Sequence, residues 1–118
     1  MPFEQKRIDH ENGIVVLALN GTLTMGNQLM KLEWTIEELL KEQHNRIVLD
    51  FSEISYLDSS AIGVIINCRG KVSAANGQLR LAKLSERVTA IFNIAKIYDL
   101  LSPDASTEDA ITQLNSGS

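Results

Sequence analysis

Apolar residues along the chain gather first into short strand-like runs and then into segments with helical spacing. Residues 4–10 alternate weakly between apolar and polar, and an Asn-Gly pair at 12–13 is a strong hairpin signal. The run at 14–19 is apolar at every position, which is typical of a central strand that is buried on both faces. The pattern therefore predicts an opening hairpin whose second strand ends at the Asn-Gly pair at 20–21.

The middle of the chain predicts two helices separated by a short strand over residues 46–51. The first helix is expected over residues 27–43, with a buried stripe formed by Leu29, Leu32, Ile36, Leu39 and Leu40. The second is expected over residues 59–75. Apolar positions at spacings of four and three give it an inward face of Ala61, Ile65, Cys68, Val72 and Ala75. Gly77 is well placed to end this helix as a left-handed residue.

The last third of the chain continues the alternation of strands and helices. A strand at 78–84 precedes a helix capped by Ser85, whose buried residues are expected to be Val88, Ile91, Phe92 and Ala95. Residues 97–101 fit either a short fifth strand or a tight connection. Ser106 with Asp109 resembles a capping box, which opens a final helix with an inward face of Ala110, Ile111 and Leu114. Residues 115–118 fit a frayed end.

Strands that alternate with helices after an initial hairpin indicate an α/β fold. We expect a mixed, mostly parallel sheet of four or five strands with right-handed crossovers and about four helices. At 118 residues the chain fits one domain, with an ordered core at about 4–114 inside a single domain over 1–118.

The amino-acid composition and the net charge limit which kinds of molecule the chain is expected to bind. Apolar residues make up 44% of the chain and charged residues 22%, which is ordinary for a globular protein. The net charge of −4 argues against nucleic acid and against anionic membrane surfaces, which need a basic protein face. A single cysteine, Cys68, excludes an intrachain disulfide, and we expect it to be an inert core residue. No long apolar segment is present for a leader or a membrane span, so we expect a cytoplasmic location.

Motifs for catalysis are missing from the sequence. A serine hydrolase needs a base near its nucleophile, but His10 and His44 are the two histidines and no G-x-S-x-G elbow is present. Two isolated histidines are also too few for a metal site, and the glycine-rich phosphate cradles are absent. We therefore expect neither an enzyme nor a bound cofactor.

The segment Asp58-Ser59-Ser60 places three small polar side chains at the first turn of the second helix. Unpaired backbone N–H groups and the positive end of the helix dipole favour negative charge there. Ser59, Gly63, Ile66 and Gly70 recur at spacings of four, three and four, so they line one solvent-facing strip. The two glycines leave the backbone open to another surface, and Ile66 is expected to be an exposed apolar contact.

Residues 58–64, Asp-Ser-Ser-Ala-Ile-Gly-Val, follow Ile-Val-Leu-Asp at 47–50 and Tyr-Leu at 56–57. This pattern closely resembles the signature of the STAS family, which includes the bacterial anti-sigma-factor antagonists. The resemblance extends over most of the chain, through residues 21–23, 76–79 and 106–114.

The resemblance implies a STAS-like domain in which Ser59 is phosphorylated by an anti-sigma factor that is also an ATP-dependent serine kinase. Unphosphorylated antagonists of this type bind the kinase and free the sigma factor, and a serine phosphatase restores them. The resemblance carries over Asp58, Ser59, Ser60 and Gly63. Ala61 stands where the family usually has glycine, which costs little because alanine is a good helix former.

The resemblance and the helical strip together predict a phosphorylatable protein-binding switch. Phosphate on Ser59 would add roughly −1.5 to −2 charges, which the helix tolerates and a complementary partner face does not. The expected partner-binding surface consists of Asp58, Ser59, Ser60, Ile62, Gly63, Ile66 and Gly70.

Other interpretations stay open at this point. The chain could be a STAS subunit or regulator of a transporter or signalling complex, with the region Asp58–Ser60 as an unmodified docking surface. Asp58 or Ser59 could be only a helix cap, or Asp58 could be the cap and Ser59 the acceptor. For binding of a small molecule or a nucleotide, the sequence contains no glycine-rich phosphate-binding motif.

Met30 and Trp34, four residues apart, fall opposite the buried stripe of the first helix. They either cover a neighbouring loop or form an exposed apolar pair for self-association or docking. We favour the first interpretation, because a single tryptophan is more often partly buried. A weak homodimer stays an option.

Overall fold

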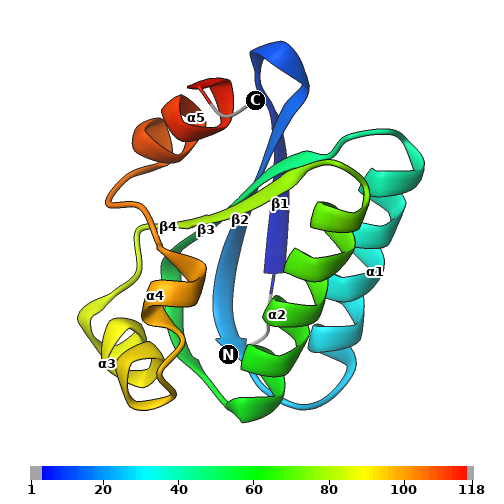
Figure 1. The fold of residues 1–118 in the computed structure, drawn as a ribbon. Helices are drawn as coiled ribbons and strands as arrows, with labels where there is room; N and C mark the ends of the chain where they lie inside the picture. The colour runs from blue at the N-terminus through cyan, green and yellow to red at the C-terminus, as the bar shows by residue number, and fades with distance from the viewer. Residues whose placement is uncertain (1–3, 117–118) are drawn as a thin grey trace.

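The computed structural model describes residues 4–116 (Figure 1). Strand β1 (Glu4–Asp9) pairs antiparallel with β2 (Ile14–Leu23), and a short 3-10 turn at Glu11–Gly13 joins them. Asn12 and Gly13 of this turn have φ values of 64° and 73°, which is the left-handed region that Asn-Gly pairs adopt readily. The predicted opening hairpin is confirmed.

Between residues 4 and 116 the sheet has four strands, in the order β1-β2-β3-β4. Strands β3 (Arg46–Leu57) and β4 (Gln78–Ala82) run parallel to β2, so the predicted mixed, mostly parallel sheet is confirmed. The expected end of β2 at the Asn-Gly pair and the end of β3 at Phe51 were wrong. Both strands continue and pair with each other as far as Leu23 and Leu57, because two register shifts absorb the irregular Asn-Gly segment.

Within the described residues, five α-helices accompany the sheet: α1 (Asn27–Lys41), α2 (Ser59–Ala74), α3 (Glu86–Ile94), α4 (Tyr98–Leu101) and α5 (Thr107–Ser116). The one-turn helix α4 occupies the segment for which a fifth strand or a tight connection was expected. Ser85 and Ser106 accept hydrogen bonds from the backbone N–H groups of Val88 and Asp109, so both predicted serine caps are confirmed.

The core forms two layers on opposite faces of the sheet (Figure 1). The larger layer packs α1 to α4 against one face, and Phe51 and Phe92 meet edge to face in it, with ring centroids 6.4 Å apart. The smaller layer packs α5 over Ile14, Val16, Val48 and Ala82.

The predicted inward faces are largely confirmed. The buried residues of α1 and α2 are Leu29, Leu32, Ile36, Leu39, Ala61, Ile65, Cys68 and Val72. Leu40 is half-buried, while Ala75 and Ala95 are exposed because each is the cap residue where its helix ends. Burial raises the pKa of the Cys68 thiol to about 12, which keeps it protonated and supports an inert core role.

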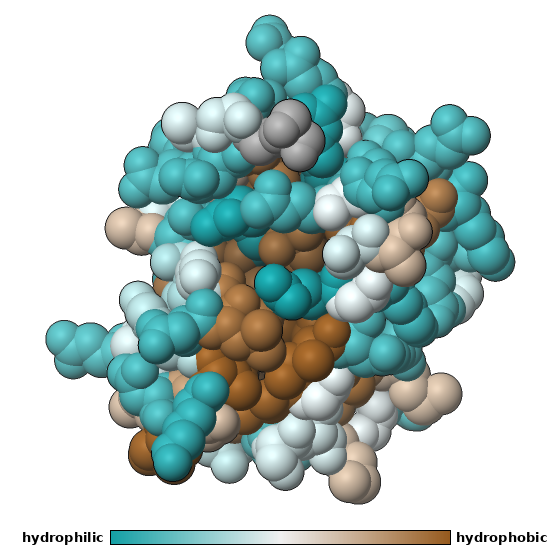
Figure 2. All heavy atoms as spheres, viewed as in Figure 1, coloured by the Kyte–Doolittle hydropathy of each residue, from teal (hydrophilic) through white to brown (hydrophobic). Residues whose placement is uncertain are grey.

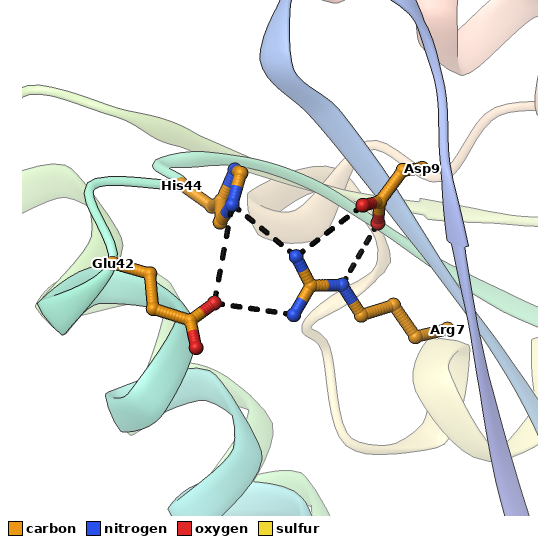
Figure 3. Close-up of polar contacts among 4 residues, drawn as sticks. All are labelled: Arg7, Asp9, Glu42 and His44. Carbon is orange, nitrogen blue, oxygen red and sulfur yellow. Dashed lines mark hydrogen bonds and ion pairs between the residues drawn. The ribbon is translucent and has the colours of Figure 1, made fainter.

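The edge strand β1 is held against the C-terminal end of α1 by polar contacts (Figure 3). The Arg7 guanidinium donates to Asp9 Oδ1 at 2.8 Å and to Glu42 Oε1 at 3.1 Å, and it lies 3.2 Å from His44 Nε2. These exposed groups fix the position of the strand and contribute little to stability.

The segment after α2 differs from the prediction in one detail. Asn76, and not Gly77, is the left-handed residue, with a φ of 61°. Gly77 is required for another reason: a Cβ atom built on it would overlap the backbone carbonyl of Asn45. The chain therefore passes directly against the start of β3 before it enters β4.

This close approach gives a first testable prediction. Gly77→Ala should lower the free energy of unfolding by about 1–3 kcal/mol, because backbone must move to admit the methyl group. Gly70→Ala is the matched control, since a Cβ there meets nothing within 4 Å. Alanine at Gly70 should raise stability by up to about 1 kcal/mol through helix propensity. Urea unfolding of both variants measures the difference, and a Gly77→Ala protein as stable as the parent would contradict it.

Candidate functional site

The candidate site lies where β3 ends and α2 begins, beside the loop that joins β2 to α1 (Figure 1). Leu57, the last residue of β3, is buried, and Asp58 follows it in an extended conformation before the helix starts at Ser59. Because β2 and β3 are parallel, their carboxyl ends meet at this edge of the sheet. The sequence segments 23–25 and 57–61 are thereby brought together.

Asp58 uses both of its carboxylate oxygens to join these segments. Oδ1 accepts from the backbone N–H of Ala61 at 3.0 Å, so Asp58 caps the helix, where the sequence had left Asp58 and Ser59 as alternatives. Oδ2 accepts from the backbone N–H of Met25 at 2.9 Å, and the N–H of Asp58 donates to the carbonyl of Leu23 at 3.1 Å. The Met25 hydrogen bond is the main cause that lowers the pKa of Asp58 below its ordinary value, so the group is ionised at neutral pH.

The two serines after Asp58 are left available by this arrangement. Asp58 caps the helix, and neither serine hydroxyl makes a side-chain hydrogen bond to any residue between 4 and 116. Ser59 is exposed and Ser60 is half-buried. At the first turn of a helix, the dipole stabilises the negative charge that a phosphoryl group brings. An exposed hydroxyl there could therefore be phosphorylated without unfolding the turn.

The outer strip of α2 is open, as the glycine spacing predicts. Gly63 and Gly70 are exposed, and a Cβ atom on either would meet nothing within 4 Å. The expectation that Ile66 is exposed was wrong, because its side chain is half-buried and packs against the larger core layer. The strip therefore exposes the helix backbone at Gly63 and Gly70, and the half-buried side chain of Ile66 lies between these two glycines.

An apolar hollow opens directly beside Ser59, between the N-terminal end of α2 and the C-terminal end of α3. Figure 2 shows apolar surface gathered between α2 and the segment α3–α4. Ile62 of α2 is half-buried in the hollow, and Ile94 of α3 is 82% exposed at its rim. The hollow is lined by Tyr56, Leu57, Asp58, Ser59, Ile62, Ile91, Ile94 and Ala95.

The contribution of α3 was missed from the sequence. Helical spacing places Arg87, Ile91 and Ile94 on one face of α3, but only the fold brings that face next to Ser59. The Arg87 guanidinium lies over the ring of Tyr56, 5.0 Å from its centroid, and so adds a cation at the border of the hollow.

Two further observations concern ligands and membranes. Among residues 4–116, no three His, Cys, Asp or Glu side chains come together in a way that could hold a metal ion. Within the same described part of the chain, no helix is both long enough and apolar enough to cross a bilayer.

Comparison with known proteins identifies the family. The STAS domain model matches residues 5–110, and the chain belongs to this family. It is 33% identical over 95 residues to a candidate anti-sigma factor antagonist of Thermotoga neapolitana, which covers 75% of this chain and 84% of that protein. It is 31% identical over 72 residues to the anti-sigma-B factor antagonist of Bacillus subtilis (strain 168), which covers 61% of this chain and 66% of that protein.

Solved structures share the fold at lower identity. Phosphorylated SpoIIAA of Bacillus superimposes with a TM-score of 0.71 at 21% identity, over 93% of this chain and 98% of that one. The unphosphorylated anti-sigma factor antagonist SpoIIAA gives a TM-score of 0.72 at 19% identity, over 95% and 98% of the two chains. The predicted STAS-like α/β fold is thus confirmed.

The two hydrogen bonds of Asp58 can be separated by mutation. Asp58→Ala removes both and should lower the free energy of unfolding by about 1–2 kcal/mol. Asp58→Ser keeps an oxygen that can cap Ala61 but cannot also reach Met25, so it should cost less. Amide hydrogen exchange should show loss of protection at Met25 in both variants and at Ala61 only in Asp58→Ala. Retained protection of Met25 in either variant would contradict the assignment.

The lowered pKa of Asp58 predicts a pH dependence with a defined sign. The stabilisation by its carboxylate is complete above the ordinary pKa of 3.8 and declines as the pH falls from there toward the lower pKa of the folded state. The difference in unfolding free energy between the parent protein and Asp58→Ala should therefore be constant from pH 7 to about pH 5 and shrink below about pH 4. Urea titrations at each pH measure it. A difference that grows on acidification would have the wrong sign.

Proposed function

We propose that this chain is an anti-sigma factor antagonist, a non-enzymatic binding protein regulated by phosphorylation of Ser59. In its unmodified form it would sequester an anti-sigma factor that is also a serine kinase, and phosphorylation of Ser59 would release that partner. The observation that carries the proposal is the exposed Ser59 hydroxyl, which no side chain in the described range 4–116 engages, between an open helix strip and an apolar hollow.

The binding surface has two parts that meet at Ser59. Gly63 and Gly70 would let a partner approach the backbone of α2 closely, with Ile66 between them. The hollow would receive an apolar side chain against Ile62, and the exposed Ile94 would complete that contact. Asp58 and Ser60 complete the surface: Asp58 fixes its geometry, and Ser60 is half-buried next to the acceptor.

Phosphate on Ser59 would act on the complex and not on the fold. It adds roughly −1.5 to −2 charges at the positive end of α2, where the dipole stabilises an anion by about 0.3–1 kcal/mol. In a closed interface the same charge would be desolvated or would face a surface shaped for a neutral hydroxyl, which can cost several kcal/mol. At about 1.4 kcal/mol per decade, affinity would fall by two or more orders of magnitude.

The relatives support this role. Belonging to the STAS family is compatible with it, and the B. subtilis relative is named as an antagonist of an anti-sigma factor. SpoIIAA, which shares the fold, has been solved both with and without phosphate. We infer for this chain a cytoplasmic role in transcriptional regulation, with a serine phosphatase to reverse the modification.

The test is a comparison of two Ser59 variants against the purified anti-sigma factors of the source organism. Ser59→Ala should bind its cognate partner about as tightly as the parent chain, whereas Ser59→Asp should bind about 100-fold more weakly, because it places a charge in the interface. Isothermal titration calorimetry measures both affinities, and circular dichroism confirms that both variants are folded.

Matched controls show which surface is used. Ile94→Asp should weaken the same complex, whereas Ile8→Asp, at an exposed isoleucine on β1, should not. Incubation of the cognate kinase with ATP should phosphorylate the parent chain at Ser59, as located by mass spectrometry, and should leave Ser59→Ala unmodified. Equal affinity of Ser59→Ala and Ser59→Asp for a bound partner would reject the switch and favour an unmodified docking surface of a transporter or signalling complex.

A further inference from the structure

The outward ridge of α1 carries the single tryptophan of the chain in an exposed position. Trp34 is 62% exposed and Met30, one turn earlier, is 67% exposed, so the expectation that they cover a neighbouring loop was wrong. Both lie on the side of α1 opposite the buried residues Leu32 and Ile36. An exposed tryptophan and methionine next to each other in the middle of a helix are typical of a contact surface.

The flank of α1 that faces α2 is already occupied. Glu33 accepts a hydrogen bond of 2.7 Å from the Asn67 side chain, and Lys71 forms ion pairs with Glu33 and Glu37. These contacts fix α1 beside α2 and leave the ridge of Met30 and Trp34 pointing away from the domain.

We propose that this ridge is the interface of a weak, two-fold symmetric homodimer, in which α1 of one copy crosses antiparallel to α1 of a second copy at Trp34. The two tryptophans would pack against each other across the symmetry axis, with Met30 of each copy beside them. The proposal concerns α1 and does not depend on the role of Ser59 on α2.

The charges that flank Trp34 favour a second copy in this orientation. Lys31 lies one turn before Trp34 and Glu38 one turn after it, and their separation of seven residues puts them on the same flank of the helix. In an antiparallel two-fold pair, Lys31 of each copy therefore faces Glu38 of the other. A parallel pair would not form these two ion pairs, because its symmetry places this flank against the opposite flank of the other copy, which carries Glu33 and Glu37.

Neither charge is fully engaged within its own chain. Lys31 is exposed and forms no ion pair with another residue in the range 4–116. Glu38 pairs at 3.2 Å with Lys41, whose side chain is 77% exposed, and this exposed pair leaves Glu38 available to a second cation. The ridge is thus self-complementary in charge as well as apolar at its centre.

The size of the ridge sets the strength of the association. Stable interfaces bury about 1,600 Å² in total, and the outer ridge of one helix of 15 residues offers less than that. The dimer should therefore be weak and visible as a dependence on protein concentration.

Sedimentation velocity of the full chain over a concentration series tests the proposal. The parent protein should sediment faster as its concentration rises, and its fluorescence, which comes from one tryptophan, should shift to the blue and become less accessible to acrylamide. Trp34→Ala should weaken self-association at least about tenfold. Ile94→Ala, which removes an even more exposed apolar side chain from α3, is the matched control and should leave self-association unchanged.

Charge reversal tests the antiparallel register. Lys31→Glu and Glu38→Lys should each weaken the dimer about threefold to tenfold, and the double variant should recover it, because the pair is restored with reversed sign. Circular dichroism checks that each variant is folded. No self-association up to millimolar concentration, a dimer that survives Trp34→Ala, or a double variant as weak as the single ones would overturn the proposal.

Discussion

The candidate site depends on one aspartate, Asp58, whose carboxylate and backbone N–H together hold three segments in place. Asp58 caps α2 through Ala61, fixes the loop before α1 through Met25, and takes part in the strand pairing through Leu23. Because a carboxylate can accept from two N–H groups at once, no neighbouring hydroxyl is needed as a cap. Ser59 is therefore released from a structural role, which separates the residue that builds the helix start from the residue that we propose is modified.

This division of roles explains why a charged modification at Ser59 need not disturb the domain. The first turn of α2 is fixed by Asp58 and by the buried Ala61 and Ile65, and none of these contacts uses the Ser59 side chain. The exposed glycines of the same helix are unfavourable for helix stability by about 1 kcal/mol each. Their presence in an otherwise well-packed helix is understandable if the outer strip is shaped for close contact with another protein.

Features that depend on neighbouring residues could be predicted from the sequence. Features that depend on contacts between distant segments could be found only in the structure. The hairpin, the inward face of α2 and a polar helix cap at Asp58 or Ser59 follow from turn propensity, helical spacing and residue chemistry. The full length of β2 and the hydrogen bond between Asp58 and Met25 depend on which strands become neighbours. Burial of Ile66 and exposure of Ile94 depend on how α3 and α2 pack, which the spacing of either helix alone does not contain.

The two proposed surfaces lie on neighbouring helices that are fixed to each other, and this geometry has a consequence for affinity. Lys71 joins α2 to Glu33 and Glu37 of α1, so the Ser59 site and the Trp34 ridge belong to one rigid layer of the domain. A two-fold dimer through α1 would hold its two Ser59 sites at a fixed distance and in a fixed orientation. Even a weak dimer would then strengthen binding to a partner that itself offers two sites, because the second contact becomes intramolecular. Phosphate on one copy would remove that gain as well as its own contact, and the response to partial phosphorylation would become steeper than one site alone allows.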